Sequence, residues 1–376
     1  MSYSDNNSEG GSHDRGQLSV IDISKKGREK FRSRKYREAC ELFALGLERE
    51  PDNPYLLSGM GDACREIGNL EEAERCYRRL LDVDRNNLFA LRGLGDVCKK
   101  QGRHQEAIRN WKQYLGLRPR DKHVMTRIAD SCKTLMQFDQ AEETYRQILK
   151  YEPQERFALT GIADLQHRLG RDVEAIRYYE MVLEFDQNEL HILTIVGKLC
   201  WRINDFDKAE KYFRRALKID PKNPYALYGL GNCYRWHRQY QKTLEVWSEI
   251  LEFSEGNKTL HSRMGDVYVH LNQPEAAEKS YQLALQEGYD RFAMVGLVRL
   301  LCERDMWQQA IDIFWSLCEK EEAADLQLEE LSKRFVRSGQ RELMLAFFRR
   351  LLAAERGSEA ACTGIRSLLE KLQSND

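Results

Sequence analysis

Cysteine is the residue type that first suggests chemistry in this sequence, because thiolates bind metals and carry redox reactions. The chain has ten cysteines, and Cys64, Cys98 and Cys132 are spaced 34 residues apart, with Cys200 at twice that spacing beyond them. The sequence contains no CxxC pair and no Cys/His cluster with zinc spacing. A cysteine position that recurs at such long intervals is best explained by a repeated unit in which cysteine acts as a small apolar residue of the core. We therefore expect no metal and no cofactor.

Other catalytic motifs are missing from the sequence. The eight histidines are scattered, and no HExxH zinc motif occurs. The GxG pairs at 93–95 and 229–231 follow no predicted strand, and there is no Walker or GxSxG sequence. From about Val20 onward the residues belong to one repeated pattern, which leaves no room for a separate catalytic domain. The sequence therefore predicts that the protein is not an enzyme.

Composition argues against several classes of protein. The 376 residues include 59 Lys plus Arg and 60 Asp plus Glu, for a formal net charge of −1. This balance argues against a protein that coats nucleic acid or an anionic membrane. No run of 18 apolar residues occurs, so we expect no membrane insertion. Met1–Gln17 is polar and lacks the order of a secretory signal, which predicts a cytoplasmic protein.

A period of 34 residues organises the chain. Three positions recur at this period: a small residue, an aromatic residue four later, and a glycine or alanine twelve before the small residue. The small residues are Ala39, Ala73, Ala107, Ala141, Ala175, Ala209, Thr243 and Ala277; the aromatic residues are Phe43, Tyr77, Trp111, Tyr145, Tyr179, Phe213, Trp247 and Tyr281; the preceding residues are Gly27, Gly61, Gly95, Ala129, Ala163, Gly197, Gly231 and Gly265. Residues four apart share one face of a helix, so the pattern predicts paired helices that approach closely at the glycine or alanine.

The seven prolines agree with this register, although they were not used to find it. Pro51, Pro119, Pro153 and Pro221 fall where the second helix of a pair should have ended, Pro54 and Pro224 where the next first helix should begin, and Pro274 near the start of a second helix. Proline is tolerated at these boundaries and disfavoured inside a helix. The chain is therefore predicted to be a series of helix–turn–helix units.

A 34-residue helix–turn–helix repeat with this signature resembles the tetratricopeptide repeat family, from about Val20 to Ser358. The resemblance implies an all-α, right-handed α-solenoid superhelix of about ten repeats with a C-terminal capping helix. We expect a disordered polar tail at 1–19, eight regular repeats at 20–290, two degenerate repeats at 291–358, and the capping helix and tail at 359–376. In the degenerate repeats, Trp307, Phe347 and Phe348 are expected to leave apolar surface that allows self-association.

In this family the first helix of each pair lines the concave surface, which identifies candidate partner-binding residues. The residue after the glycine or alanine slot is acidic in several repeats, and the residue three further on is often basic. In repeats two to four these residues are Asp62, Asp96 and Asp130 in the acidic row, and Arg65, Lys99 and Lys133 in the basic row. The spacing lets each aspartate meet the basic residue on its own helix. Two interpretations stay open: a self-neutralised solvated face, or a groove that exchanges these pairs for a bound peptide.

Some family members bind a C-terminal carboxylate through a basic residue four positions before an asparagine. At this spacing the chain has Arg92 before Asp96, Ser58 before Asp62, and Tyr228 before Asn232. Aspartate replaces asparagine in repeats two to four, and it would repel a carboxylate. The carboxylate-binding function therefore does not carry over, and we expect a ligand of basic or mixed charge in those repeats.

Repeats six and seven differ, because aromatic residues gather on their first helices. Trp201 and Trp236 are expected on or beside the concave surface, close to Tyr225, Tyr228, Asn232 and Arg235. Clusters of aromatic residues and arginine are typical of binding hot spots. For Trp201 the alternative is packing between repeats.

The sequence therefore predicts a non-catalytic interaction scaffold or adaptor that binds a peptide or helix of a protein partner in its concave groove. Two alternatives stay open. One is a nucleic-acid-binding helical repeat protein, which the aspartate row and the net charge of −1 oppose. The other is a peptide-sensing regulatory subunit.

Overall fold

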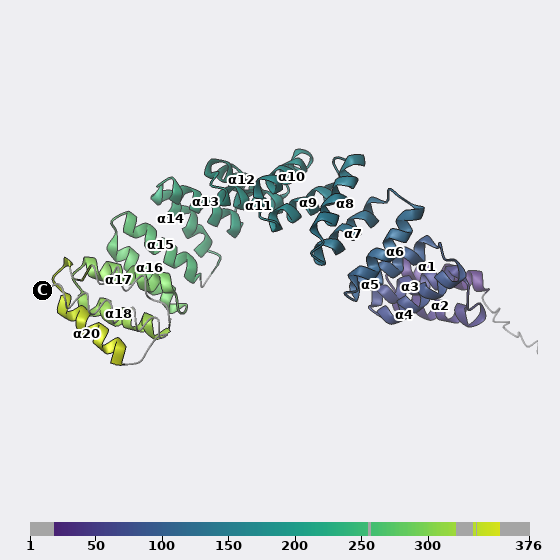
Figure 1. The fold of residues 1–376 in the computed structure, drawn as a ribbon, viewed down its shortest axis with the longest axis horizontal. Coiled ribbons are helices and arrows are strands. Elements are labelled where there is room, and N and C mark those ends of the chain that lie inside the picture. The colour runs from purple at the N-terminus through teal and green to yellow at the C-terminus, as the bar shows by residue number, and fades with distance from the viewer. Residues whose placement is uncertain (1–18, 255–256, 321–333, 336, 354–376) are drawn as a thin grey trace, which may run out of the picture. The chain divides into compact units, whose positions relative to one another are not determined.

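A computed structural model describes residues 19–254, 257–320, 334–335 and 337–353, and the described part contains helices and no strand (Figure 1). The tail predicted for 1–19, apart from Ser19, and the capping helix predicted for 359–376 lie outside the described residues. The helices are α1 (Val20–Arg32), α2 (Tyr36–Arg49), α3 (Pro54–Ile67), α4 (Leu70–Val83), α5 (Leu88–Lys100), α6 (His104–Leu117), α7 (Lys122–Thr134), α8 (Phe138–Tyr151), α9 (Arg156–Arg168), α10 (Asp172–Phe185), α11 (Leu190–Arg202), α12 (Phe206–Ile219), α13 (Pro224–Trp236), α14 (Tyr240–Leu251), α15 (Lys258–His270), α16 (Pro274–Gln286), α17 (Arg291–Glu303), α18 (Trp307–Lys320) and α20 (Arg341–Ala353).

The chain divides into two compact units, Met1–Gln187 and Asn188–Asp376. Within each unit, a helix packs against the one that follows it, and the first helices of neighbouring pairs also touch, as α3 touches α5 and α11 touches α13. This order of contacts is that of an α-solenoid, in which each pair is stabilised by its neighbours. In the described residues the all-α solenoid prediction is confirmed.

Helix boundaries follow from capping residues in the loops. Asn53 caps α3, with its side-chain oxygen accepting a hydrogen bond from the backbone N–H of Tyr55 at 3.0 Å. Asn223 caps α13 in the same way through Ala226 at 3.1 Å. Pro54 and Pro224 occupy the first positions of these two helices, where a missing N–H costs nothing.

The aromatic residue of each pair explains the small residues in the period. The Tyr77 side chain is fully buried. A Cβ atom at Gly61 would lie 2.7 Å from its ring, and one at Gly93, on the next first helix, would lie 2.4 Å from it. The ring therefore occupies the space that side chains at both glycines would need, and it joins one repeat to the next.

The cysteine slot belongs to this core. Cys64, Cys98, Cys132 and Cys200 are buried, as the apolar interpretation of the slot predicts. Cys64 lies 3.8 Å from Cys40 between their sulfur atoms. Burial raises the pKa of the Cys98 thiol to about 11, so this thiol is protonated at neutral pH.

The C-terminal part of the second unit corrects one prediction. Phe347 and Phe348 are buried, and Phe347 packs against Phe314 at 5.6 Å between ring centroids. Trp307 is half-buried and meets Phe335 edge to face at 4.8 Å. The aromatic residues expected to leave an apolar surface for self-association thus form an internal cluster, because α18 and α20 pack their apolar faces together.

Candidate partner-binding site

The aspartate row of the first unit is held by buried tyrosines. The Tyr77 hydroxyl donates a hydrogen bond to Asp62 at 2.6 Å, and the Tyr145 hydroxyl donates one to Asp130 at 2.5 Å. In the ninth and tenth helices the Tyr179 hydroxyl donates to the carboxylate fifteen residues before it. These aspartates therefore have a structural role: each accepts the polar end of an otherwise buried ring.

Asp96 is the exception, because its repeat carries Trp111 in the aromatic slot. The indole N–H donates to the backbone oxygen of Arg92 at 3.4 Å, so Asp96 is not needed as its acceptor. Asp96 instead lies between Arg65 on α3, at 3.4 Å, and Arg127 on α7, at 3.1 Å. Burial raises the pKa of this carboxyl, and the two arginines act in the opposite direction.

The basic row forms only part of the expected pairing. Arg65 lies 3.5 Å from Asp62, and Lys133 lies 3.8 Å from Asp130, each pair on one helix as predicted. No ion pair between Lys99 and Asp96 is found in the described residues, because Asp96 is taken by arginines of the two neighbouring first helices. The first-unit face is therefore largely neutralised by its own contacts.

The acidic row changes in the second unit. Lys198 on α11 and Asn232 on α13 occupy the slot that holds aspartate in α3, α5, α7 and α9. Their repeats carry Phe213, which has no hydroxyl, and Trp247, whose N–H donates to the backbone oxygen of Tyr228 at 3.3 Å. Because neither ring requires a carboxylate partner, Lys198 and Asn232 do not have the structural role that the aspartates have in the first unit.

A pocket of about 800 Å³ lies over these two slots. Side chains on three first helices line it, together with Phe213 from α12. The lining residues are His191, Thr194, Ile195, Lys198 and Trp201 on α11; Tyr225, Tyr228, Gly229, Asn232 and Arg235 on α13; and Arg263 on α15. The pocket thus brings together five of the residues that the sequence identified: Trp201, Tyr225, Tyr228, Asn232 and Arg235.

Trp201 and Trp236 belong to one aromatic cluster, but they do not both line the pocket. The Phe206 ring lies edge to face with Trp201 at 4.6 Å and stacks on Trp236 at 4.2 Å. Trp236 is 59% exposed and is not one of the lining residues. On the other wall, Tyr228 stacks on the buried Trp247 at 5.8 Å. The pocket therefore has rigid aromatic walls, and Trp236 adds apolar surface beside it.

The polar lining of the pocket is cationic. Arg235 is half-buried and donates to the Asn232 side-chain oxygen at 3.5 Å. Burial, and then the positive charge of Arg263, lower the pKa of Arg235. Arg263 approaches one carboxylate, that of Asp266, at 4.0 Å, and this carboxylate also accepts a hydrogen bond from Tyr281 at 2.9 Å.

Arg263 was not identified from the sequence, although a signal existed. Arg263 lies two residues before Gly265, at a position of the repeat that is glycine in four of the eight repeats. In the structure, glycine at this position lies against the preceding aromatic ring, as Gly93 does against Tyr77. A large cation there does not fit into this packing, and Lys25 and Arg127 in the first unit are the other examples.

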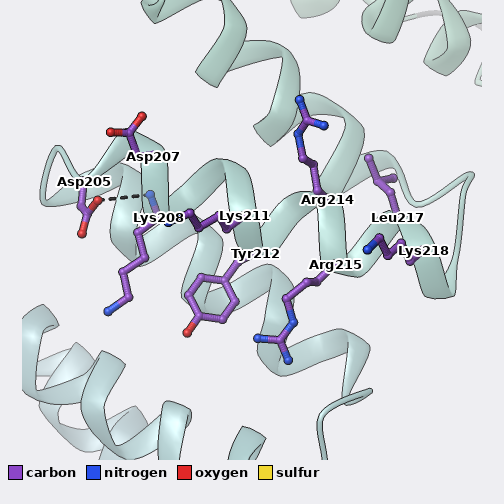
Figure 2. Close-up of a pocket in the computed structure, with 9 residues that line it drawn as sticks. All are labelled: Asp205, Asp207, Lys208, Lys211, Tyr212, Arg214, Arg215, Leu217 and Lys218. Atoms are coloured by element: carbon purple, nitrogen blue, oxygen red, sulfur yellow. Dashed lines mark hydrogen bonds between the residues drawn. The ribbon is translucent and has the colours of Figure 1, made fainter.

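A second hollow, of about 960 Å³, lies on α12 (Figure 2). Its cations lie along this second helix: Lys208, Lys211, Arg214, Arg215 and Lys218. Arg214 is occupied by contacts with Glu210 at 2.8 Å and with the Tyr234 hydroxyl at 2.9 Å. The Asp205 side chain caps α12 through the Lys208 backbone N–H at 3.2 Å. Because its polar groups serve local structure, this hollow is the weaker candidate.

Two further features of the described residues bear on other functions. No group of three or more His, Cys, Asp or Glu side chains in that part of the chain could hold a metal ion. None of the described helices is long and apolar enough to span a membrane.

Comparison with known proteins places the repeats in a family. Models of the tetratricopeptide repeat match residues 24–87, 56–120, 134–189, 204–242 and 259–287. No curated protein matches the chain.

A structure of MamA is 21% identical, with a TM-score of 0.43, and the match covers 44% of this chain and 91% of MamA. The type IV pilus biogenesis factor PilW is 16% identical, with a TM-score of 0.48, covering 56% and 98%. A tetratricopeptide repeat protein from Parabacteroides merdae is 19% identical, with a TM-score of 0.45, covering 65% and 96%.

Proposed function

Because the chain belongs to the tetratricopeptide repeat family, we propose that it is a non-catalytic scaffold that binds a segment of a protein partner in the pocket of α11, α13 and α15. The observation that carries this proposal is the pocket itself. It joins rigid aromatic walls to half-buried arginines on α13 and α15 and to a lysine on α11. Aromatic residues and arginine in a concave site are the usual anchors of protein recognition.

The rigidity of the walls supports binding. Trp201 is held by Phe206, and Tyr228 is held by Trp247, so few side-chain rotations are lost when a ligand arrives. Tyr225, at the rim, is 78% exposed and makes no aromatic contact in the described residues. A large apolar area that is fixed but uncovered is the kind of surface that a partner can bury.

The first unit offers a weaker site. Its aspartates accept hydrogen bonds from buried tyrosines or pair with arginine, so a ligand would have to displace contacts that stabilise the fold. The proposal therefore moves the main site from the charged rows of repeats two to four to repeats six to eight. A cytoplasmic location remains a prediction of the sequence, to be tested by cell fractionation.

Affinity capture of partners from a native lysate, with quantitative mass spectrometry, tests the proposal. The Tyr225→Ala/Trp201→Ala variant is compared with wild type and with Tyr55→Ala. Tyr55 occupies the same slot on α3 and is also largely exposed. We expect at least one protein to be retained by wild type and by Tyr55→Ala, and lost from the pocket variant with unchanged circular dichroism.

Two results would contradict the proposal. Identical proteins on all three baits would place binding outside the pocket. Nucleic acid that copurifies with wild type, and is lost with the pocket variant, would favour the nucleic-acid-binding alternative, since aromatic rings and arginines can also stack on bases. Nuclease treatment before capture separates that result from a protein partner.

A further inference from the structure

We propose that the pocket of α11, α13 and α15 recognises an acidic internal segment of its partner, in which carboxylate side chains pair with Lys198, Arg235 and Arg263 while an apolar side chain packs against Trp201 and Tyr228. This inference rests on the proposed function and specifies the chemistry of the bound segment. It concerns repeats six to eight, whereas the basic or mixed ligand charge that the sequence suggested applies to repeats two to four.

The charge of the lining is the first support. The residues that line the pocket include two arginines, a lysine and a histidine, and no aspartate or glutamate is among those that the structure describes there. The carboxylate that Arg263 approaches is that of Asp266, which is shared with the Tyr281 hydroxyl. Cations that lack a full complement of carboxylates favour an acidic partner.

The position of Lys198 is the second support. In α3, α7 and α9 the same slot carries an aspartate that accepts a hydrogen bond from a buried tyrosine. On α11 the corresponding ring is Phe213, which needs no acceptor. A reversal of charge from aspartate to lysine is therefore compatible with the fold here. The same substitution at Asp62 or Asp130 would leave a buried hydroxyl without its acceptor.

The state of Arg235 is the third support. Its guanidinium is half-buried beside Arg263, and both effects lower its pKa. In the described residues its polar contact is a long hydrogen bond to the neutral Asn232 side chain. A ligand carboxylate would relieve the repulsion between the two arginines and would replace part of the lost hydration.

The distribution of these cations favours several side-chain carboxylates over one terminal carboxylate. Lys198, Arg235 and Arg263 come from three different helices, α11, α13 and α15. Packed helices lie about 8–10 Å apart, whereas alternate side chains of an extended peptide lie about 7 Å apart. A segment with acidic residues at alternate positions can therefore reach cations on successive helices, and an apolar residue at a further alternate position lies on the same face of the segment.

A library of random peptides displayed by their C-terminal ends, so that none has a free carboxyl terminus, provides the test. It is selected against the full chain, and the recovered peptides are synthesised with amidated ends. Binding is then measured by fluorescence anisotropy to wild type, to Arg235→Gln/Arg263→Gln and to Trp201→Ala. The matched control is Lys150→Gln/Lys279→Gln, which removes two positive charges from exposed positions on the second helices α8 and α16.

We expect recovered peptides to be enriched in aspartate and glutamate near an apolar residue. Their affinity should fall at least about tenfold in the double arginine variant, a loss of about 1.4 kcal/mol. It should stay within about twofold in the lysine control and weaken as salt rises. Replacing the acidic residues of a recovered peptide by their amides should weaken its binding to wild type in the same way.

The possible failures are distinguishable. Peptides that bind wild type and are lost from Trp201→Ala, but show no acidic enrichment and bind the double arginine variant equally well, would overturn the inference and leave the proposed function standing. Recovered peptides that bind Trp201→Ala and the double arginine variant as tightly as wild type would overturn both. A library that yields no binding peptide would also overturn the inference, because every displayed peptide is an internal segment.

Discussion

The hydrogen bond between Tyr145 and Asp130 gives the sharpest energetic prediction. The tyrosine side chain is 0% exposed, and its hydroxyl donates to a carboxylate oxygen at 2.5 Å, with the carboxylate 40% exposed. A hydrogen bond to a charged group contributes about 1.5–3 kcal/mol to the free energy of unfolding. Because solvent reaches the carboxylate, we expect a value near the lower limit for Tyr145→Phe, about 1.5 kcal/mol. Tyr151→Phe removes an exposed hydroxyl from the same helix and should cost less than about 0.5 kcal/mol.

A double-mutant cycle isolates this bond. Asp130→Ala should cost about 1–3 kcal/mol, because it leaves the buried hydroxyl without an acceptor. In the Tyr145→Phe background the same change should cost about 1–2 kcal/mol less, since no hydroxyl remains to be stranded. Urea unfolding of the full chain measures the free energies, and hydrogen exchange of α7 and α8 shows whether the loss is local. A coupling energy below about 0.3 kcal/mol would refute the structural role of the aspartate row.

Three further predictions concern packing and charge. Asp96→Asn should lower the free energy of unfolding by about 1–3 kcal/mol in urea denaturation, because it removes the negative charge between two arginines; no change would show that this carboxylate is dispensable. Gly231→Ala should lower the free energy of unfolding by about 1–3 kcal/mol, because its Cβ would lie 2.0 Å from the indole nitrogen of Trp247. A Cβ at Gly116 would meet nothing within 4 Å, so Gly116→Ala should raise the free energy of unfolding by about 0.5 kcal/mol. Equal effects of the two changes would contradict the close approach at Gly231. Burial raises the pKa of Cys76 and of Cys233 from 9.0 to about 12. The contribution of these protonated thiols to the free energy of unfolding is therefore complete below pH 9 and is lost as pH rises toward 12. Circular dichroism at increasing pH should show this loss of stability, and the C76A/C233A variant should show a smaller one.

The sequence was sufficient to predict the helical solenoid because every repeat carries the same packing solution. An aromatic ring that fits between two glycines imposes one period on the chain, and Tyr77 with Gly61 and Gly93 shows why those residue types recur. Prolines and asparagines at the loops added the helix boundaries. These signals are local, so they can be read without knowing how distant parts of the chain meet.

The candidate site was only partly predictable. Trp201, Tyr228 and Arg235 were found because aromatic residues and an arginine gather on the first helices of repeats six and seven. The role of Asp62 was missed, although each of the four tyrosines in the aromatic slot has an aspartate fifteen residues before it. The sequence spacing suggested that Asp96 pairs with Lys99 on its own helix, whereas Asp96 pairs with arginines on the two neighbouring first helices. This pairing depends on how the helices stack, which the sequence does not give.

The burial of Phe347 also could not be read from the sequence. Its repeat is degenerate, and the period loses a residue between Ala277 and Ala310, so no slot indicated whether the ring points inward. In the structure, Phe314 and Trp315 of α18 cover it. The burial of Phe347 thus results from tertiary packing between two helices of degenerate repeats, which no periodic signal in the sequence describes.

Site-specific photo-crosslinking tests the central claim, that the pocket of α11, α13 and α15 is where a partner binds. A photoreactive phenylalanine derivative is placed at Tyr225, on the rim of the pocket, or at Lys279, on the exposed face of α16. The account predicts a crosslinked partner protein from Tyr225 that is absent from Lys279 and is lost when Trp201→Ala is added. Crosslinking to the same protein at Lys279, or an unchanged crosslink from Tyr225 in the Trp201→Ala variant, would contradict it.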